Sequence, residues 1–290
     1  MIMKKIKNTF LVGLFTSLAA ILVLSSCQKS YNPKSYAPKK PAPSFNGYSS
    51  SAEIETSNLV AYWPFSGSLK DSLSTTTGVA TGTSFTTGVE GQGLQGAANG
   101  YVISDVPAAV KALHSFTITT WYNMAENTNG VVALVDIVNS QNFWGDFDMF
   151  LENPPNSTTA NLKVHVWNTA GSTTGVDAWE GDYVIDDAFN QWNQVSVTYD
   201  DASSTVTVYY NGASVGTNTQ AGFAPLNWTA STQMVFGTLQ FQTNPSLTSA
   251  TTSQSWANYL TGKMDQVRIY DTALSGSELS ALYNLEKLGR

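Results

Sequence analysis

Alternation of apolar and polar residues with a period of two is the feature that most restricts how this chain can fold. It is clear in Phe116–Tyr122 and Leu162–Trp167, where β-branched, aromatic and aliphatic residues alternate with Thr, Lys and His. The same pattern predicts further strands over Trp192–Tyr199, Thr205–Tyr210, Ala213–Thr217, Met234–Thr238 and Lys263–Tyr270. Helical periodicity is almost absent between them, so we expect an all-β, antiparallel sandwich or barrel. A parallel α/β sheet would need crossover helices.

Local signals define one hairpin and one helix. Asn211-Gly212 suits a tight turn because both residues adopt positive φ at low cost. With a turn over 200–204, it predicts a three-stranded meander over 192–217. Ser275 and Glu278 have the spacing of a capping box, which predicts a short helix near the C-terminal end.

The N-terminal segment has the pattern of a secretory signal. Lys4, Lys5 and Lys7 precede an apolar run over 10–24, which is short for a membrane span of about 20 residues. Leu24-Ser25-Ser26-Cys27 then resembles the lipobox of bacterial lipoproteins. The resemblance implies a signal peptide over 1–26, lipidation of Cys27 and, with Gln28 next, an outer-membrane anchor. The alternative is an uncleaved membrane anchor.

Composition divides the rest of the chain. Residues 27–55 are rich in Pro, Lys, Ser, Tyr and Asn without apolar periodicity, which predicts a flexible tether. Residues 56–290 form the predicted domain. Seven of the 14 Lys and Arg residues but only two of the 21 acidic residues precede it, so its net charge is −12. Such a surface excludes nucleic acid as a partner and favours divalent cations and neutral ligands, or simply provides solubility.

Three segments together resemble the laminin-G-like, or concanavalin A-like, jelly-roll family. They are Leu59–Ser72 followed by Gly91–Leu94, Phe116–Trp121 followed by Trp192–Asp200, and Gly262–Ser275. The resemblance covers about 59–285. It implies two stacked antiparallel sheets whose first and last strands meet. It also implies a module that binds glycans or proteins, although some enzymes share the architecture.

The same resemblance implies a structural calcium ion between the N-terminal and C-terminal strands. Asp71 and Asp265 are the matching positions. Calcium takes six to eight oxygen ligands, many of them backbone carbonyls, so two carboxylates are enough to start a site. The alternative is that both aspartates cap turns.

Aromatic residues beside carboxylates are the candidates for ligand binding. The acidic stretch Asp177–Asp187 interleaves both kinds of side chain, as a sugar site requires. Trp167 is expected on the outward face of its strand with Lys163 and His165. The candidate ligand-binding residues are Trp144, Trp167, Trp179, Asp182 and Tyr183, and Trp228 and Trp256 also lie in loop-like sequence. The alternatives are a solvated acidic loop and a tryptophan covered by neighbouring chain.

A catalytic alternative rests on Asp146, Asp148 and Glu152, which alternate along one predicted strand. The run resembles the acidic strand of jelly-roll glucanases, although its spacing departs from theirs, and a retaining glycosidase needs two carboxyl groups about 5–5.5 Å apart. The sequence therefore predicts a cell-envelope lipoprotein that binds a glycan and is not an enzyme. A docking subunit of an outer-membrane complex and a glycoside hydrolase are the alternatives.

Overall fold

A computed structural model describes residues 42–127, 130–152, 156–169, 175–223 and 225–290. The predicted signal peptide, Cys27 and most of the predicted tether lie outside the described residues. Pro43–Arg290 form one compact unit. Of the helices in the described ranges, none has the length and apolar content needed to cross a membrane.

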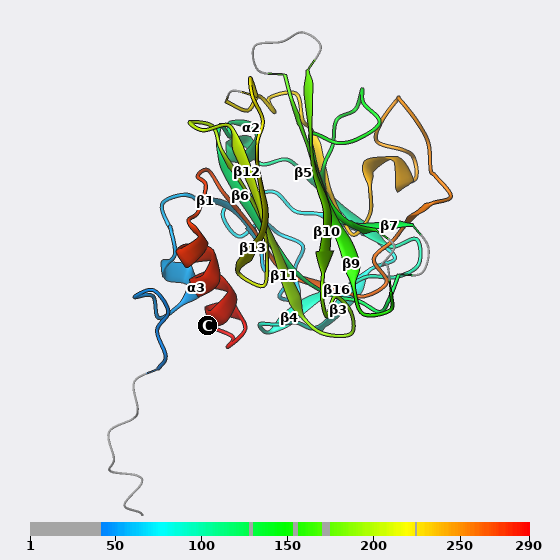
Figure 1. Cartoon of the computed structure of the whole chain (residues 1–290). Helices are drawn as coiled ribbons and strands as arrows, with labels where there is room; N and C mark the ends of the chain where they lie inside the picture. Colours follow the sequence, from blue (N-terminus) through cyan, green and yellow to red (C-terminus); the bar gives the residue numbers. More distant parts are fainter. Residues whose placement is uncertain (1–41, 128–129, 153–155, 170–174, 224) are drawn as a thin grey trace, which may run out of the picture. The chain divides into compact units, whose positions relative to one another are not determined.

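The first sheet is antiparallel, and its strands follow the order β13-β12-β11-β6-β16-β4-β3, with β1 also paired to β16 (Figure 1). Its strands are β1 (Leu59–Trp63), β3 (Ser84–Thr87), β4 (Gln92–Gln95), β6 (Phe116–Asn123), β11 (Asn193–Asp200), β12 (Thr205–Tyr210), β13 (Ala213–Thr219) and β16 (Lys263–Tyr270). Ala61 pairs with Ile269, so the first and last strands meet as predicted.

The second sheet has the order β10-β9-β8-β7-β14-β5-β2, and the two-residue β15 pairs in parallel with β7. Its strands are β2 (Val79–Thr81), β5 (Tyr101–Asp105), β7 (Val131–Ile137), β8 (Phe147–Glu152), β9 (Ala160–Asn168), β10 (Val176–Ile185), β14 (Gln233–Phe236) and β15 (Ala257–Asn258). The predicted two-sheet jelly-roll sandwich is confirmed. One prediction is wrong. The acidic stretch around Trp179 was expected to be a loop, and it instead contains most of the strand β10.

The main core lies between the two sheets. Ile118 and Val197 face inward from the first sheet, while Met149, Leu151 and Val164 face inward from the second, and all are buried. Because successive side chains of a strand point to opposite faces, the residues between these positions are directed outward. On β8, the outward residues are therefore Asp148, Phe150 and Glu152.

The helix α3 (Gly276–Glu286) covers the outer face of the first sheet and begins with the predicted capping box of Ser275 and Glu278. Its Glu286 is buried and accepts hydrogen bonds from Arg268 Nε (2.7 Å), Trp121 Nε1 (2.6 Å) and Gln194 Nε2 (2.8 Å). The helix is thus fixed to three strands, β16, β6 and β11, by one carboxylate.

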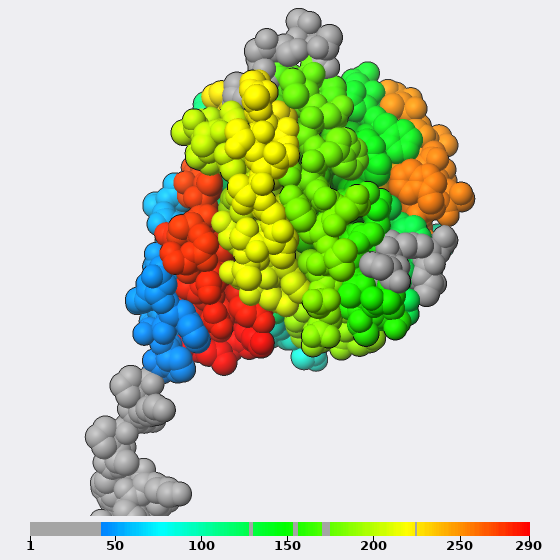
Figure 2. All heavy atoms as spheres, viewed as in Figure 1, coloured from blue at the N-terminus to red at the C-terminus, as the bar shows by residue number. Residues whose placement is uncertain are grey.

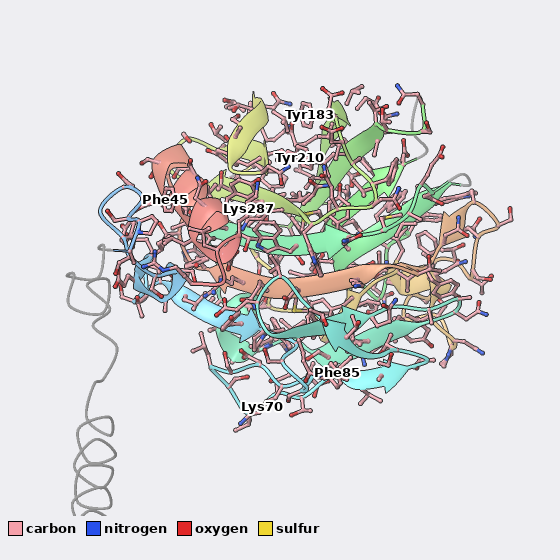
Figure 3. All side chains as sticks on the ribbon, turned by 90° about the horizontal axis from the view of Figure 1, so that it is seen from below. Phe45, Lys70, Phe85, Tyr183, Tyr210 and Lys287 are labelled. Carbon is pink, nitrogen blue, oxygen red and sulfur yellow. The ribbon has the colours of Figure 1, made fainter. Side chains whose placement is uncertain are left out.

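Residues 43–55, which composition assigns to the tether, pack on this helix. The side chain of Ile54 is 1% exposed in a cluster with Leu279 and Leu282, and Phe45 packs at its edge. Figure 3 shows Phe45 beside this helix. The folded unit therefore begins at Pro43 rather than at residue 56, because a few widely spaced apolar residues anchor a segment whose average composition is polar.

The outer face of the second sheet is partly covered by residues 239–257, which include the 3-10 helix η3 (Gln240–Gln242). In Figure 2 the orange surface of residues near 250 lies beside the green surface of the second sheet. The two outer faces therefore differ. The first faces the helix and the N-terminal segment, and the second carries aromatic and acidic residues.

Candidate ligand-binding face

A row of four side chains crosses the outer face of the second sheet. Asp136 on β7 lies opposite Asp148 on β8, Asp148 lies opposite His165 on β9, and His165 lies opposite Trp179 on β10. All four positions are directed outward by the strand alternation. The sheet register therefore brings together residues that are up to 43 positions apart in sequence.

Trp179 is the solvent-facing end of this row. Its side chain is 43% exposed. Its ring lies on His165, with 4.5 Å between the centroids, and meets the edge of Trp144 at 5.1 Å and 84°. These two neighbours hold one indole in a fixed orientation with much of its surface free. A flat, fixed and exposed aromatic ring is the kind of surface on which the apolar face of a sugar ring stacks.

Trp144 connects Trp179 to a second tryptophan. Its ring stacks on Phe150 at 5.5 Å and 11°, and lies 5.9 Å from Trp256. Trp179 and Trp256 both contact Trp144 and not each other. We call Trp144, Trp179 and Trp256, with Phe150 and His165 beneath them, the aromatic face. Trp144 and Trp256 are half-buried.

The position of Trp256 depends on a glycine in β7's preceding turn. Val131 N donates a hydrogen bond to the carbonyl of Trp256 at 2.9 Å, and a Cβ atom on Gly130 would lie 1.6 Å from that carbonyl oxygen. Gly130 also has a φ of +67°, in the left-handed region. A side chain at residue 130 would therefore displace the segment that carries Trp256.

His165 is held from both sides by carboxylates. Its Nδ1 lies 2.9 Å from Asp148 Oδ2, and its Nε2 lies 2.7 Å from Asp177 Oδ1. Burial alone would lower the pKa of this imidazole, but its hydrogen bonds to Asp148 and Asp177 raise the pKa to about 9. The ring is therefore an imidazolium at neutral pH and donates both N–H groups.

Asp136 completes the buried end of the row. It is fully buried, and burial together with the neighbouring Asp148 raises its pKa well above the usual range. Its Oδ2 accepts a hydrogen bond from Gln240 N at 2.7 Å, which ties η3 to the sheet. Asp136 is therefore neutral, and the ion pair of this row is the one between Asp148 and His165.

A cation and two further carboxylates flank the aromatic face. Lys163 on β9 forms ion pairs with Glu152 Oε2 and Asp182 Oδ1, both at 2.9 Å. Beside Glu152, an open recess of about 270 Å³ is lined by Gly130, Val131, Glu152 and Trp256. The recess adjoins the Trp256 end of the aromatic face.

The structure unites some of the predicted ligand residues and separates others. Trp144 and Trp179 are in contact, and Asp182 forms an ion pair with Lys163, which lies opposite Phe150. Trp167 lies on the same outer face but is half-buried, and Gly175 approaches its ring so closely that a Cβ there would lie 1.9 Å from it.

Two of the predicted ligand-binding candidates, one tyrosine and one tryptophan, lie outside the aromatic face. Tyr183 donates a hydrogen bond to Glu180 at 3.1 Å and packs against Gly216 of the first sheet, away from the tryptophans. Trp228, expected to be an exposed loop residue, is 1% exposed in the main core, where Phe116 contacts its ring at 5.3 Å. The loop around Trp228 turns inward, which local sequence does not reveal.

Sequence reasoning missed the role of His165 and Asp177. His165 lies on the outward side that the sequence predicts for its strand, whereas Asp177 lies in a stretch that was expected to be a loop. Nothing in the sequence shows that Asp148 is opposite His165. The signal that could have found the site is the alternation of Asp148 with Phe147 and Met149, because a carboxylate in a buried strand needs a partner.

The carboxylates of the glucanase-like run do not form a free pair. Asp148 is 0% exposed and bound to His165, while Asp146 is 6% exposed and accepts hydrogen bonds from Asn139 Nδ2 and Ser231 Oγ. Burial raises the pKa of Asp146 to about 6 despite these two donors. Glu152 is engaged by Lys163. The run therefore presents no two carboxyl groups free to act on a substrate together.

The two predicted calcium ligands have separate hydrogen-bond partners. Asp71 Oδ1 accepts from Tyr62 N and Leu73 N, whereas its Oδ2 is buried without a partner. Asp265 Oδ2 accepts from Val89 N and Glu90 N.

The remaining oxygen of Asp265, Oδ1, accepts from Gln266 N at 2.9 Å, and burial raises the pKa of this carboxyl to about 7. Within the described ranges, no three His, Cys, Asp or Glu side chains gather in a way that could hold a metal ion. Asp71 keeps an oxygen that fits a cation, and Asp265 does not, so the shared calcium site stays a prediction.

The fold and the family agree. The family model described as the concanavalin A-like lectin/glucanases superfamily matches residues 95–280. The chain belongs to this superfamily. No curated protein matches the sequence. In this concanavalin A-like domain, the aromatic face lies on the outer face of one of the two family sheets.

Solved structures show the same fold at low sequence identity. The binding domain of Paraclostridial mosquitocidal protein 1 has a TM-score of 0.57 and 18% identity, with 79% of this chain and 52% of that chain covered. Domain 4 of AbnA, a GH43 extracellular arabinanase from Geobacillus stearothermophilus in complex with arabinotriose, has a TM-score of 0.50 and 17% identity, with 78% and 98% covered.

The binding domain of botulinum neurotoxin DC in complex with SialylT has a TM-score of 0.55 and 15% identity, with 80% of this chain and 52% of that chain covered. This concanavalin A-like chain thus spans about half the length of the toxin binding domains and nearly all of the arabinanase domain. At these identities, the likeness concerns the fold.

Proposed function

We propose that this protein is a non-catalytic, glycan-binding lipoprotein of the cell envelope, and that its ligand stacks on Trp179. The observation that carries the proposal is the exposed indole of Trp179, fixed between the ring of His165 and the edge of Trp144. An isolated exposed tryptophan on a solvated strand would have no reason to be oriented by two other rings and a buried ion pair.

The polar groups around Trp179 suit sugar hydroxyls. Asp177 is 54% exposed while it accepts a hydrogen bond from His165, so its carboxylate is fixed in place and still reaches solvent. A binding site for a sugar combines an apolar platform with a few placed acceptors, and this pair supplies both. Solved structures of similar fold include complexes with arabinotriose and with N-acetylneuraminic acid, which supports a carbohydrate as the ligand class.

The absence of catalysis is part of the proposal. Asp148, the residue that the glucanase-like run would need, neutralises the buried His165 and is closed to solvent. We expect no reducing-sugar release by the protein from any glycan that it binds, and no change in this result for Asp148→Asn. If the protein released reducing sugar and Asp148→Asn abolished the release, the protein would be a glycoside hydrolase and the non-catalytic proposal would be wrong.

The envelope location rests on the lipobox-like Leu24-Ser25-Ser26-Cys27. We propose that Cys27 carries the lipid and that the chain is anchored to the outer membrane. Cells expressing the full-length protein and a Cys27→Ser variant, labelled with a fatty acid analogue, should show label only in the former. Equal labelling, or none in either, contradicts the lipid anchor and leaves glycan binding to be judged separately.

Glycan binding is tested by a glycan array and by affinity gels with the full-length protein. We expect retention by at least one glycan and its loss in Trp179→Ala. Phe85→Ala is the matched control, because Phe85 is 37% exposed on β3 of the first sheet. Figure 3 shows Phe85 far from Tyr183, which lies on β10.

Two results would overturn the proposal. No retention across a broad panel would favour the docking subunit of an outer-membrane complex. Retention that Phe85→Ala lowers as much as Trp179→Ala would show that the aromatic face is not the binding site.

A further inference from the structure

The exposed charges around the aromatic face are acidic. The side chains of Asp177 and Asp182 are 54% and 72% exposed, and that of Glu152 is 31% exposed at the recess. All three are on β8 or β10, the strands on either side of β9. A ligand that approaches Trp179 therefore meets carboxylates on both sides.

The cations of this face are already occupied. Lys163 is the single Lys or Arg on strands β7 to β10, and its ammonium group contacts both Glu152 and Asp182 at 2.9 Å. His165 is 1% exposed, lies under Trp179 and is paired with Asp148 and Asp177. The other basic residues of the described chain lie on other elements: Lys70, Lys111, Lys263, Arg268, Lys287 and Arg290.

An anionic sugar would therefore be repelled. A carboxylate or sulfate needs a free cation or backbone donors, and like charges placed together at an interface lose affinity. A neutral sugar is complementary to this face, because its hydroxyl groups donate hydrogen bonds to carboxylates and its C–H face stacks on an indole. The charge of this face thus selects against acidic glycans.

The aromatic face also extends beyond one sugar ring. Trp179 and Trp256 are separated by Trp144, which contacts both at 5.1 and 5.9 Å. The recess of about 270 Å³ lies at the Trp256 end, with the Glu152 carboxylate in its wall. Trp179 and Trp256 each contact Trp144 but not each other, so a ligand that used both ends would need to be an oligosaccharide.

We propose that the ligand is a neutral oligosaccharide that stacks on Trp179, passes over Trp144 and places a further sugar in the recess between Trp256 and Glu152. This inference rests on the proposed glycan binding and adds the ligand class and a second subsite. Asp177 accepts hydroxyl hydrogen bonds at the first subsite and Glu152 does so at the second. Lys163 holds Glu152 and Asp182 in place and is not available to an acidic group.

The test measures dissociation constants by calorimetry with the full-length protein. The probes are neutral gluco-, xylo-, manno- and arabino-oligosaccharides from the monosaccharide to the hexasaccharide, and matched oligosaccharides that carry a uronic or sialic acid. We expect affinity to rise by roughly tenfold or more from mono- to trisaccharide and then to level off, because the second subsite is then filled. A tenfold change in affinity is about 1.4 kcal/mol. The acidic counterparts should bind at least about tenfold more weakly, by the same relation.

Variants separate the two subsites. Trp256→Ala should remove the gain in affinity with ligand length, whereas Trp179→Ala should abolish binding of ligands of every length. Asp182→Asn frees Lys163 from one of its two partners and should narrow the difference between neutral and acidic ligands. Phe85→Ala should change none of these values.

The outcomes distinguish this inference from the proposed function. Tight binding of sialylated or uronate-containing glycans that Trp179→Ala abolishes would leave glycan binding in place and overturn the neutral ligand. Equal affinity for all lengths, or no effect of Trp256→Ala, would overturn the second subsite. No binding of any glycan would overturn the proposed function and this inference with it.

Discussion

The ring of Trp179 packs on the ring of His165 with 4.5 Å between their centroids and 39° between their planes. His165 is an imidazolium that donates to Asp148 and Asp177, so the exposed indole lies on a buried cation. A cation near an aromatic face contributes about 0.5–2 kcal/mol, more when it is desolvated. The orientation of the exposed ring and the charge state of the buried one are therefore coupled.

Removal of the buried partner of His165 should cost far more stability than removal of the exposed one. In Asp148→Asn the imidazolium keeps a single carboxylate, and breaking a buried ion pair costs about 3–5 kcal/mol. In Asp177→Asn, an exposed partner is lost, and we expect about 1 kcal/mol or less. Urea denaturation of the two variants measures the difference. Equal losses would show that His165 is not charged in the folded protein.

Stability should fall as the pH rises through the folded pKa of His165. This pKa is raised from 6.5 to about 9, so its contribution is complete below pH 6.5, declines between 6.5 and 9 and is absent above that range. At about 1.36 kcal/mol per unit, the shift corresponds to about 3 kcal/mol. Glycan binding should weaken over the same interval, because deprotonation removes the cation beneath Trp179.

Measurements from pH 8 to pH 9 isolate the upper part of this titration. Burial raises the pKa of Asp146 to about 6 and that of Asp265 to about 7. Their contributions to stability are lost as the pH rises through these values, and so are already gone at pH 8. The wild type should lose stability as the pH rises through this range, whereas the stability of the His165→Gln variant should stay constant. Parallel curves for the two proteins would contradict the assignment.

The N-terminal segment should contribute to stability although its composition resembles a linker. Ile54 is 1% exposed against Leu279 and Leu282 of α3. Replacing a buried Ile by Ala costs about 2–5 kcal/mol through lost burial and a residual cavity. We expect Ile54→Ala to lower the free energy of unfolding by this amount, and the exposed Ser57→Ala to leave it within about 0.5 kcal/mol. No difference between them would place the segment outside the folded unit.

Calcium binding remains a prediction, and Asp71 is the residue on which it now depends. Its buried Oδ2 has no partner, so a bound cation would satisfy it. A ligand that binds only the native state stabilises by about 2.7 kcal/mol at a hundredfold excess over its dissociation constant. Calcium should therefore raise the melting temperature of the wild type relative to EGTA, but not that of Asp71→Asn. Coincident melting curves in the two buffers would contradict calcium binding.

Patterns that are local in sequence were sufficient to predict the fold. The alternation in Phe116–Tyr122 and the turn at Asn211-Gly212 predicted strands and a hairpin that are present, and Asn211 and Gly212 have φ values of 51° and 75°. The capping box of Ser275 and Glu278 predicted the start of α3. These features follow from the conformations of neighbouring residues, which is why one sequence is enough to identify them.

The composition of the segment before residue 56 was misleading, and so was the loop-like sequence around Trp228. Phe45 and Ile54 are too far apart to show a period, yet both pack on α3. Trp228 has no strand pattern around it and still fills the core. In both cases, burial depends on a partner surface that is distant in sequence, so no local pattern records it.

The sequence by itself determined that this chain forms two antiparallel sheets with an acidic surface and outward-facing aromatic residues. The tertiary structure decided which of those residues form one site. Strand register placed His165 between Asp148 and Trp179, and the pairing of β15 with β7 brought Trp256 beside Trp144. Strand alternation is a property of neighbouring residues, whereas register depends on how whole strands align to bury their apolar faces.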